Sequence, residues 1–324
     1  GLRVGYAVGS AGIMRILGKT LLPYHVNAWS LTVAEEVYRH KDLYQERIAA
    51  IIEQREMLRE QFEQMGLKVW PSATNFLTCC PQGVETQGID YENVHQVTAM
   101  KLDYDFDTDK YEIKDIKLFD RGFDFYAPQT FAGLDNQTHA MLFGWIGLPD
   151  LTYPTDKFKW HSALTLPREL RLEGSKIYQR PIDKIYENLT ALSSLHFDEK
   201  ADIANLDRAY IKFEANNQAF DLTFFQNEKG QSLRLSYENG LVCLDRSQSE
   251  QTELMEKFDT KRFCEIENLQ TVEIFFDRSI IEIFFNHGEK AMTSRFFIEN
   301  RKNTIISNHP LDLMIGYLPA IQYI

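Results

Sequence analysis

Residues 271–288 read TVEIFFDRSIIEIFFNHG. β-Branched and aromatic residues fill two runs, and Asp277-Arg278-Ser279 separates them. Such residues are enriched in strands, and a short polar stretch between two apolar runs is typical of a hairpin. We therefore predict two antiparallel strands here, with Glu273 and Glu282 pointing outward from a buried aromatic face.

Further short strands precede this hairpin. Apolar and aromatic runs recur between Gly, Asn, Asp and Pro turns, and they predict strands at Tyr210–Ala215, Ala219–Gln226, Ser232–Glu238 and Leu241–Asp245. Regularly spaced short strands indicate an antiparallel all-β architecture, either a sandwich or a propeller.

The first 78 residues have a different composition. They hold 9 Lys/Arg and 8 Asp/Glu, against 26 and 39 in the remainder, and only 2 of the 22 Phe. From Asp42 to Met65, apolar residues recur at three- and four-residue steps, which predicts an amphipathic helix. Shorter elements are predicted around it: a strand over 2–8, a helix over 12–19, a helix from Ser30 or Thr32 to Arg39, and a strand over 67–70. We predict a helical α/β segment that ends at a seam near Thr78–Cys80.

The overall composition excludes several classes of function. The chain of 324 residues is 44% hydrophobic and 25% charged, as in ordinary globular proteins of two or three domains. No apolar run approaches the ~18–20 residues that span a bilayer, and no signal peptide opens the sequence. The net charge of −12, without basic stripes, argues against nucleic acid as a partner. We therefore expect a cytoplasmic protein with neither a membrane nor a nucleic-acid partner.

The four cysteines show no CxxC spacing, and two of them, Cys79 and Cys80, are adjacent. This spacing argues against a metal site and against a disulfide framework. We expect reduced, buried cysteines and no metal.

Residues 79–324 strongly resemble glycoside hydrolase family 32, which contains invertases. The matching stretches, in order, are CPQGVE (80–85), YENVHQ (91–96), GFDFYAPQ (122–129), GWIG (144–147), LTLPREL (164–170), LDRS (244–247) and DRSIIEIFF (277–285), followed by MTSR (292–295). The resemblance implies a five-bladed β-propeller followed by a β-sandwich. We expect residues 79–185 to form only the last blades and residues 186–324 to form the sandwich. The fold class is thus mainly β with an N-terminal α/β fragment.

The catalytic motifs of that family are absent from this sequence. Retaining hydrolysis needs a nucleophile and an acid/base carboxylate about 5 Å apart. By the resemblance they lie in Trp-Met-Asn-Asp-Pro-Asn-Gly and Glu-Cys-Pro motifs, with a third carboxylate in Arg-Asp-Pro, and none of these occurs here. Cys79 stands where the acid/base Glu would precede Cys80-Pro81. We therefore assign no catalytic residue and expect the chain to be inactive alone.

Part of the family's sugar pocket is retained. The resemblance places Tyr126 and Trp145 in the fructosyl site, with Asp124 near both in sequence, and implies a small sugar, sucrose or its 6-phosphate, as partner. A Tyr hydroxyl can hydrogen-bond a sugar, and a Trp face can pack against its ring. The alternative is that both aromatics are core residues of a blade. Solvated or turn-forming roles are expected for other polar residues of the sandwich signature: Asp277, Glu282, His287 and Arg295.

Residues 1–77 resemble a second family, histidinol-phosphate aminotransferase. The matching stretches are GLRVGY (1–6), PYHVN (23–27) and PSATNFL (71–77), together with the long helix. The resemblance implies that Arg3 contacts the phosphate of pyridoxal phosphate. The Schiff-base lysine would precede Gly1, so the alternative is a surface Arg3 without a ligand, and we expect no bound cofactor.

The combination predicts a joined chain. An incomplete propeller exposes unpaired sheet edges and apolar faces, so we expect self-association through those edges. The apolar face of helix 42–65 needs a partner surface and is expected to cover part of the open propeller. Two other functions stay open: a non-catalytic carbohydrate-binding or interaction module, and a fragment of a pyridoxal-phosphate enzyme.

Overall fold

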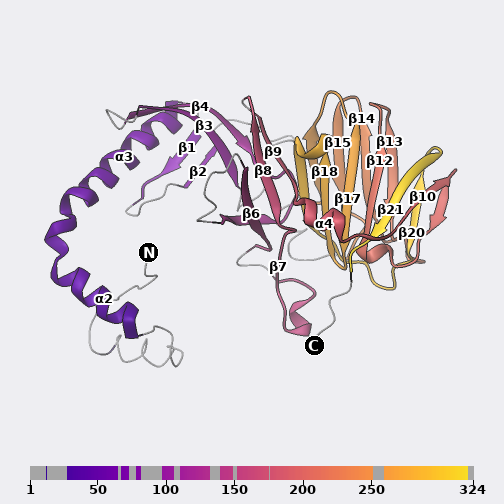
Figure 1. Ribbon diagram of the computed structural model, residues 1–324, viewed down its shortest axis with the longest axis horizontal. Coiled ribbons are helices and arrows are strands. Elements are labelled where there is room, and N and C mark those ends of the chain that lie inside the picture. Colours follow the sequence, from indigo (N-terminus) through magenta and orange to yellow (C-terminus); the bar gives the residue numbers. More distant parts are fainter. Residues whose placement is uncertain are drawn as a thin grey trace. The chain divides into compact units, whose positions relative to one another are not determined.

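The structure is a computed structural model (Figure 1). It describes residues 12, 28–64, 67–72, 78–81, 97–105, 110–131, 139–148, 152–174, 176–250 and 259–319. The chain divides into two compact units, residues 1–84 and residues 85–324. Among the described residues, no helix is long and apolar enough to cross a membrane.

The stretches 28–64, 67–72 and 78–81 of the first unit form two helices and a strand pair. Helix α2 (Ala28–Arg39) is followed by a 3₁₀ turn (Lys41–Tyr44) and by helix α3 (Gln45–Gln64). Strands β1 (Leu67–Trp70) and β2 (Thr78–Pro81) pair antiparallel. The predicted elements in this range are confirmed, except that the long helix begins as a 3₁₀ turn. The strand expected over 2–8 lies outside the described residues, as does the helix over 12–19 apart from residue 12.

Helix α3 keeps much of its apolar face exposed. Phe62 is buried, but Ile48, Ile51 and Ile52 are 45–49% exposed. The amphipathic pattern therefore predicted the helix correctly. What covers its apolar face stays a prediction, because the two units are not placed relative to each other.

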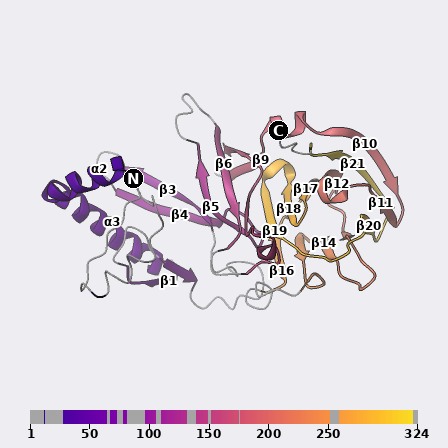
Figure 2. The same ribbon diagram turned by 90° about the horizontal axis from the view of Figure 1, so that it is seen from below.

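Two six-stranded antiparallel sheets form most of the second unit. The first, in spatial order, contains β10 (Thr190–Phe197), β21 (Leu311–Tyr317), β12 (Ala209–Glu214), β17 (Thr271–Asp277), β18 (Ile280–Phe285) and β19 (Lys290–Arg295). The second contains β11 (Lys200–Asp202), β20 (Thr304–Ser307), β13 (Phe220–Phe224), β14 (Leu233–Glu238), β15 (Leu241–Asp245) and β16 (Lys261–Glu265). Figure 2 shows the two sheets as separate layers. Their facing side chains share one continuous hydrophobic core, so this part is a sandwich.

The hairpin predicted from residues 271–288 is confirmed. Val272 pairs with Phe285 and Phe276 with Ile281 across β17 and β18. The turn residue Arg278 has φ of 56°, a left-handed conformation that suits a tight connection.

Glu273 and Glu282 point away from the core shared by the two sheets, as predicted, but the face on which they lie is not solvated. Both are buried, at 6% and 3% exposure. The outer face of the first sheet is covered by a second apolar cluster, in which Tyr186 of helix α4 (Asp183–Glu187) packs on Phe275. Tyr186 Oη also donates to Glu273 Oε2 at 2.7 Å. The sheet is therefore buried on both faces, and alternation alone could not show that.

A smaller sheet and a hairpin precede the sandwich. The sheet has the order β5 (Phe125–Thr130), β6 (His139–Ile146), β8 (Arg168–Glu173) and β9 (Lys176–Pro181), with β7 (Ala163–Leu164) beside β6. Strands β3 (Thr98–Asp105) and β4 (Lys110–Leu118) form a separate hairpin. The prediction of a mainly β chain with few helices is confirmed. No sheet closes on itself among the described strands, so the propeller and the boundaries 1–78, 79–185 and 186–324 stay predictions.

Candidate functional site

Tyr126 and Trp145 are brought together by strands β5 and β6. They are direct cross-strand partners, and their ring centroids lie 6.2 Å apart with an angle of 46° between the planes. The register shifts between Tyr126 and Gln129, and Ala127 has φ of 44°. Such a bulge bends a strand and changes the direction of its side chains, and bulges are frequent next to functional sites.

The glycine before Trp145 allows this arrangement. A Cβ at Gly144 would lie 2.3 Å from the ring of Phe125, so only glycine lets that ring pack across β6. The Gly144 N–H also donates to Thr165 Oγ1 at 3.0 Å. Residues 144–147 therefore fix the backbone on which Trp145 is presented.

Both aromatic side chains are half-buried. Tyr126 packs against a small cluster that contains Leu148 and Tyr153. Trp145 pairs with Leu164 of β7, which is 62% exposed. Because each ring keeps a partly open side, the pair offers an aromatic surface of the kind that packs against sugars.

Asp124 lies just before β5 and is fully buried, at 0% exposure. Its Oδ1 accepts a hydrogen bond from Tyr153 Oη at 2.8 Å. Its Oδ2 accepts from Arg246 Nη1 at 3.1 Å and from the Arg295 N–H at 2.7 Å. The structure thus places Asp124 in an internal polar network that joins the β5 sheet to the sandwich. Arg3, the candidate for cofactor contact, lies outside the described residues.

Burial controls the protonation of this network. Desolvation, followed by the charge of Asp124, raises the pKa of Tyr153 and keeps its hydroxyl a neutral donor. Desolvation lowers the pKa of Arg246, and the nearby Asp124 opposes that shift. Arg246 is also stacked on Phe123, with the guanidinium carbon 3.6 Å from the ring centre.

A second buried network was missed by the sequence analysis. Arg168 of β8 contacts Asp120 at 3.0 Å and Glu282 of β18 at 2.6 Å, and all three side chains are at most 4% exposed. Thr293 Oγ1 accepts from Arg168 at 2.6 Å and donates to Asp120 at 2.6 Å. Burial lowers the pKa of Arg168, but Glu282 and Asp120 outweigh it, so the net shift is upward.

Two of the solvated roles expected in the sandwich signature are therefore wrong. Glu282 and Arg295 are both buried, at 3% and 0% exposure. They lie in strands whose outer face the β5 sheet and its connections cover. His287 lies in a turn with φ of 57°, as expected, and Asp277 is exposed at the end of β17.

Among the described residues near the aromatic surface, His161 and Asp156 form a His–Asp pair. His161 Nδ1 lies 2.9 Å from Asp156 Oδ1, and Nε2 lies 3.3 Å from the Leu148 carbonyl oxygen. Since both ring nitrogens are engaged, this histidine has no position left for a substrate proton. Within the described part of the chain, no group of His, Cys, Asp and Glu is arranged to hold a metal ion.

Two family models match the chain. The glycosyl hydrolases family 32 N-terminal domain matches residues 28–181, and the glycosyl hydrolases family 32 C-terminal domain matches residues 171–309. The first match includes helices α2 and α3, which the sequence analysis assigned to an aminotransferase-like segment. The comparisons do not show the aminotransferase resemblance.

Relatives of known activity support the same family. A sucrose-6-phosphate hydrolase of Streptococcus mutans is 33% identical over 70% of this chain and 47% of its own length. The Staphylococcus xylosus enzyme of the same name is 34% identical over 71% of this chain and 48% of its own length. The chain thus spans about half the length of the curated relatives it matches.

Solved structures agree in fold. The sucrose-6-phosphate hydrolase of Lactobacillus gasseri superposes with a TM-score of 0.63 at 25% identity, covering 79% of this chain and 55% of that one. A β-fructofuranosidase of Bombyx mori superposes with a TM-score of 0.60 at 23% identity, again over 79% of this chain and 55% of that one. The two family models, which together match residues 28–309, show that the chain belongs to glycosyl hydrolases family 32.

Proposed function

We propose that this chain carries the fructosyl-binding surface of a β-fructofuranosidase of the sucrose 6-phosphate class, and that it binds sugar without hydrolysing it alone. The observation that carries the proposal is the cross-strand pair of Tyr126 and Trp145, half-buried on adjacent strands. The substrate class comes from the sucrose-6-phosphate hydrolases to which the chain is similar.

The polar groups around this surface support a binding role rather than catalysis. Asp124 is committed to protein donors, and His161 is engaged at both nitrogens. Retaining hydrolysis needs two carboxylates about 5 Å apart on either side of the glycosidic bond. The catalytic motifs of the family do not occur in the sequence. We propose that the partial propeller presents the sugar and that the missing carboxylates make the chain inactive.

Trp145→Ala should weaken fructose binding about tenfold, which corresponds to 1.4 kcal/mol. The loss follows from removing the aromatic face against which the sugar ring packs. Isothermal titration calorimetry of the full chain with fructose measures it. Phe158→Ala is the matched control, because Phe158 is a 67% exposed aromatic outside this surface. Equal affinities of the two variants would contradict the assignment.

Hydrolysis of sucrose 6-phosphate should be undetectable with the full chain. Fructose should be released no faster in the presence of the protein than in a protein-free blank. Turnover within the ordinary enzyme range of about 1–1,000 s⁻¹ would show that the catalytic carboxylates are present after all.

The aminotransferase-like origin of residues 1–77 is a further part of the proposal. It is supported by the helical character of the 1–84 unit and by the change in composition at the seam. Adding pyridoxal phosphate should give no aldimine absorbance, because neither Lys19 nor Lys68 lies in the sequence context of a Schiff-base lysine; an aldimine band would contradict this. Self-association through unpaired sheet edges is also proposed, and a monomeric elution volume in size-exclusion chromatography would exclude it.

A further inference from the structure

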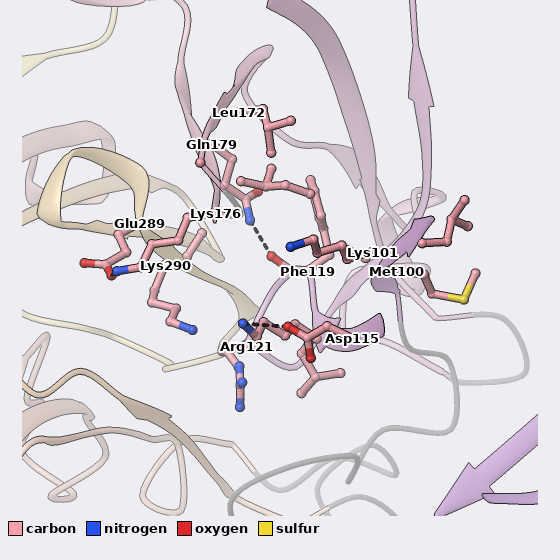
Figure 3. A pocket seen from close by; sticks show the side chains of 17 residues that line it. Met100, Lys101, Asp115, Phe119, Arg121, Leu172, Lys176, Gln179, Glu289 and Lys290 are labelled. Carbon is pink, nitrogen blue, oxygen red and sulfur yellow. Dashed lines mark hydrogen bonds and ion pairs between the residues drawn. The ribbon is translucent and has the colours of Figure 1, made fainter. Parts of the chain in front are cut away.

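A cavity of about 490 Å³ lies within the 85–324 unit. Its walls come from the β3–β4 hairpin, the segment that follows β4, the β8–β9 hairpin and the start of β19 (Figure 3). It is lined by a different set of residues from the Tyr126–Trp145 surface.

The cavity is cationic in an acidic protein. Five of its lining residues are basic (Lys101, Lys117, Arg121, Lys176 and Lys290) and two are acidic, which gives a net charge of +3. The whole chain carries −12. A cavity lined by one sign of charge concentrates ligands of the opposite sign.

The two acidic residues are already engaged. Asp115 pairs with Lys117 at 2.8 Å, and Glu289 pairs with Lys176 at 2.5 Å. The Lys290 side chain is half-buried, and its ammonium group forms no hydrogen bond or ion pair with a described residue, whereas its backbone pairs with Phe285. Its ammonium group is therefore available to a ligand.

Arg121 is held next to Lys290. The Arg121 N–H donates to the Ala291 carbonyl oxygen at 2.8 Å, which ties the two segments together, and Figure 3 shows both side chains at the same end of the cavity. Burial lowers the pKa of Lys290, and Arg121 and Lys117 add to that shift, while Cys264 and Glu289 oppose it. A half-buried ammonium group such as that of Lys290 destabilises the protein unless an anion compensates it.

Apolar side chains form the rest of the wall. Met100, Leu102, Leu172 and Ile177 line the cavity and remain 39–69% exposed. Large apolar side chains that stay exposed around a concave site are typical of ligand pockets. The ligand should therefore have an organic part beside its anionic group.

We propose that this cavity binds a phosphate monoester, with the phosphate against Lys290 and Arg121 and the organic part against Met100, Leu102 and Ile177. A phosphate monoester carries close to two negative charges at pH 7, which suits a cavity of net charge +3 better than a single carboxylate does. Guanidinium and ammonium groups are the usual protein partners of phosphate. The site is independent of the sugar surface proposed above.

Calorimetric titration of the full chain with glucose 6-phosphate and with inorganic phosphate tests the proposal. We expect saturable binding of the ester, and weaker binding of inorganic phosphate because it cannot use the apolar wall. Lys290→Gln should weaken ester binding about tenfold. Lys200→Gln removes the same charge from exposed β11, in the other layer of the sandwich, and should leave the affinity unchanged. No saturable binding up to ~10 mM ester, equal losses in the two variants, or inorganic phosphate binding as tightly as the ester would each overturn the proposal.

Thermal unfolding gives a second readout. Without ligand, Lys290→Gln should melt at a higher temperature than the unsubstituted chain, because it removes a desolvated charge beside Arg121. Glucose 6-phosphate should then raise the melting temperature of the unsubstituted chain but not that of the variant. A lower melting temperature for the ligand-free variant would mean that Lys290 serves the fold, and would contradict the proposal.

Discussion

Arg168→Met should lower the free energy of unfolding by about 3–5 kcal/mol, the usual loss when one partner of a buried ion pair is removed. Arg168 is 0% exposed and is shared by Asp120 and Glu282. Removing the guanidinium leaves two buried carboxylates without a cation. Urea denaturation of the full chain, followed by the fluorescence of its tryptophans, measures the change.

Two controls separate this effect from general damage to strand β8. Arg171→Met lies on the same strand at 33% side-chain exposure with a weak partner at 3.8 Å, so it should cost at most about 1 kcal/mol. The double variant Arg168→Met/Glu282→Met should be more stable than Arg168→Met alone. In it, Asp120 keeps the backbone donors of Gly122 and Thr293 at 2.9 and 2.8 Å. A double variant less stable than Arg168→Met would contradict the pairing.

The Arg168→Met variant should also gain a characteristic pH dependence. Burial raises the pKa of Glu282 and the charge of Arg168 opposes that shift, so removing the cation should raise the pKa of Glu282 further above its unfolded value. Carboxyls with a raised folded pKa contribute stability at low pH and lose it as the pH rises through the folded pKa. The stability deficit should therefore be smaller near pH 5 than near pH 8, and a pH-independent deficit would contradict the mechanism.

The strands of the sandwich could be predicted from the sequence because their signal is local. Apolar runs between turn residues predicted the bounds of β15, Leu241–Asp245, without error. The bounds of the other predicted strands differ from the observed ones by at most one or two residues at each end. The same local rule put Glu282 on the correct face of its strand but gave it a solvated role, because the rule assumes that one face of an antiparallel sheet meets water. Which face is covered depends on contacts such as that between Arg168 and Glu282, 114 residues apart. A pattern among neighbouring residues cannot predict a contact between two residues so far apart in the sequence.

The candidate site was predictable to a similar extent. The motifs around Tyr126 and Trp145 identified both residues, and the antiparallel register of β5 and β6 makes them neighbours. The sequence placed Asp124 with them only because it is two residues from Tyr126. Its donors, Tyr153, Arg246 and the Arg295 N–H, come from 29 to 171 residues away. The cationic cavity around Lys290 is likewise assembled from distant segments, so only the structure could reveal it.

Asp124→Ala should lower the free energy of unfolding by about 3–5 kcal/mol, because it leaves the buried Arg246 guanidinium without its carboxylate and the Arg295 N–H without its acceptor. Arg246 is 1% exposed, and its Nε and Nη2 already lack partners among the described residues. Asp312→Ala is the matched control: this aspartate pairs with His196 on the surface and should cost at most about 1 kcal/mol.

Asp124→Asn distinguishes a structural role of Asp124 from a role in sugar binding. It keeps the shape and an oxygen acceptor for Tyr153 but removes the charge that balances Arg246. If Asp124 serves the fold, the variant should lose about half as much stability as Asp124→Ala, while the protein that stays folded binds fructose with unchanged affinity. If Asp124 contacts the sugar, the variant should keep its stability and lose affinity. Because both carboxylate oxygens already accept hydrogen bonds from protein donors, we expect the first result, with denaturation and calorimetry measured on the same preparation.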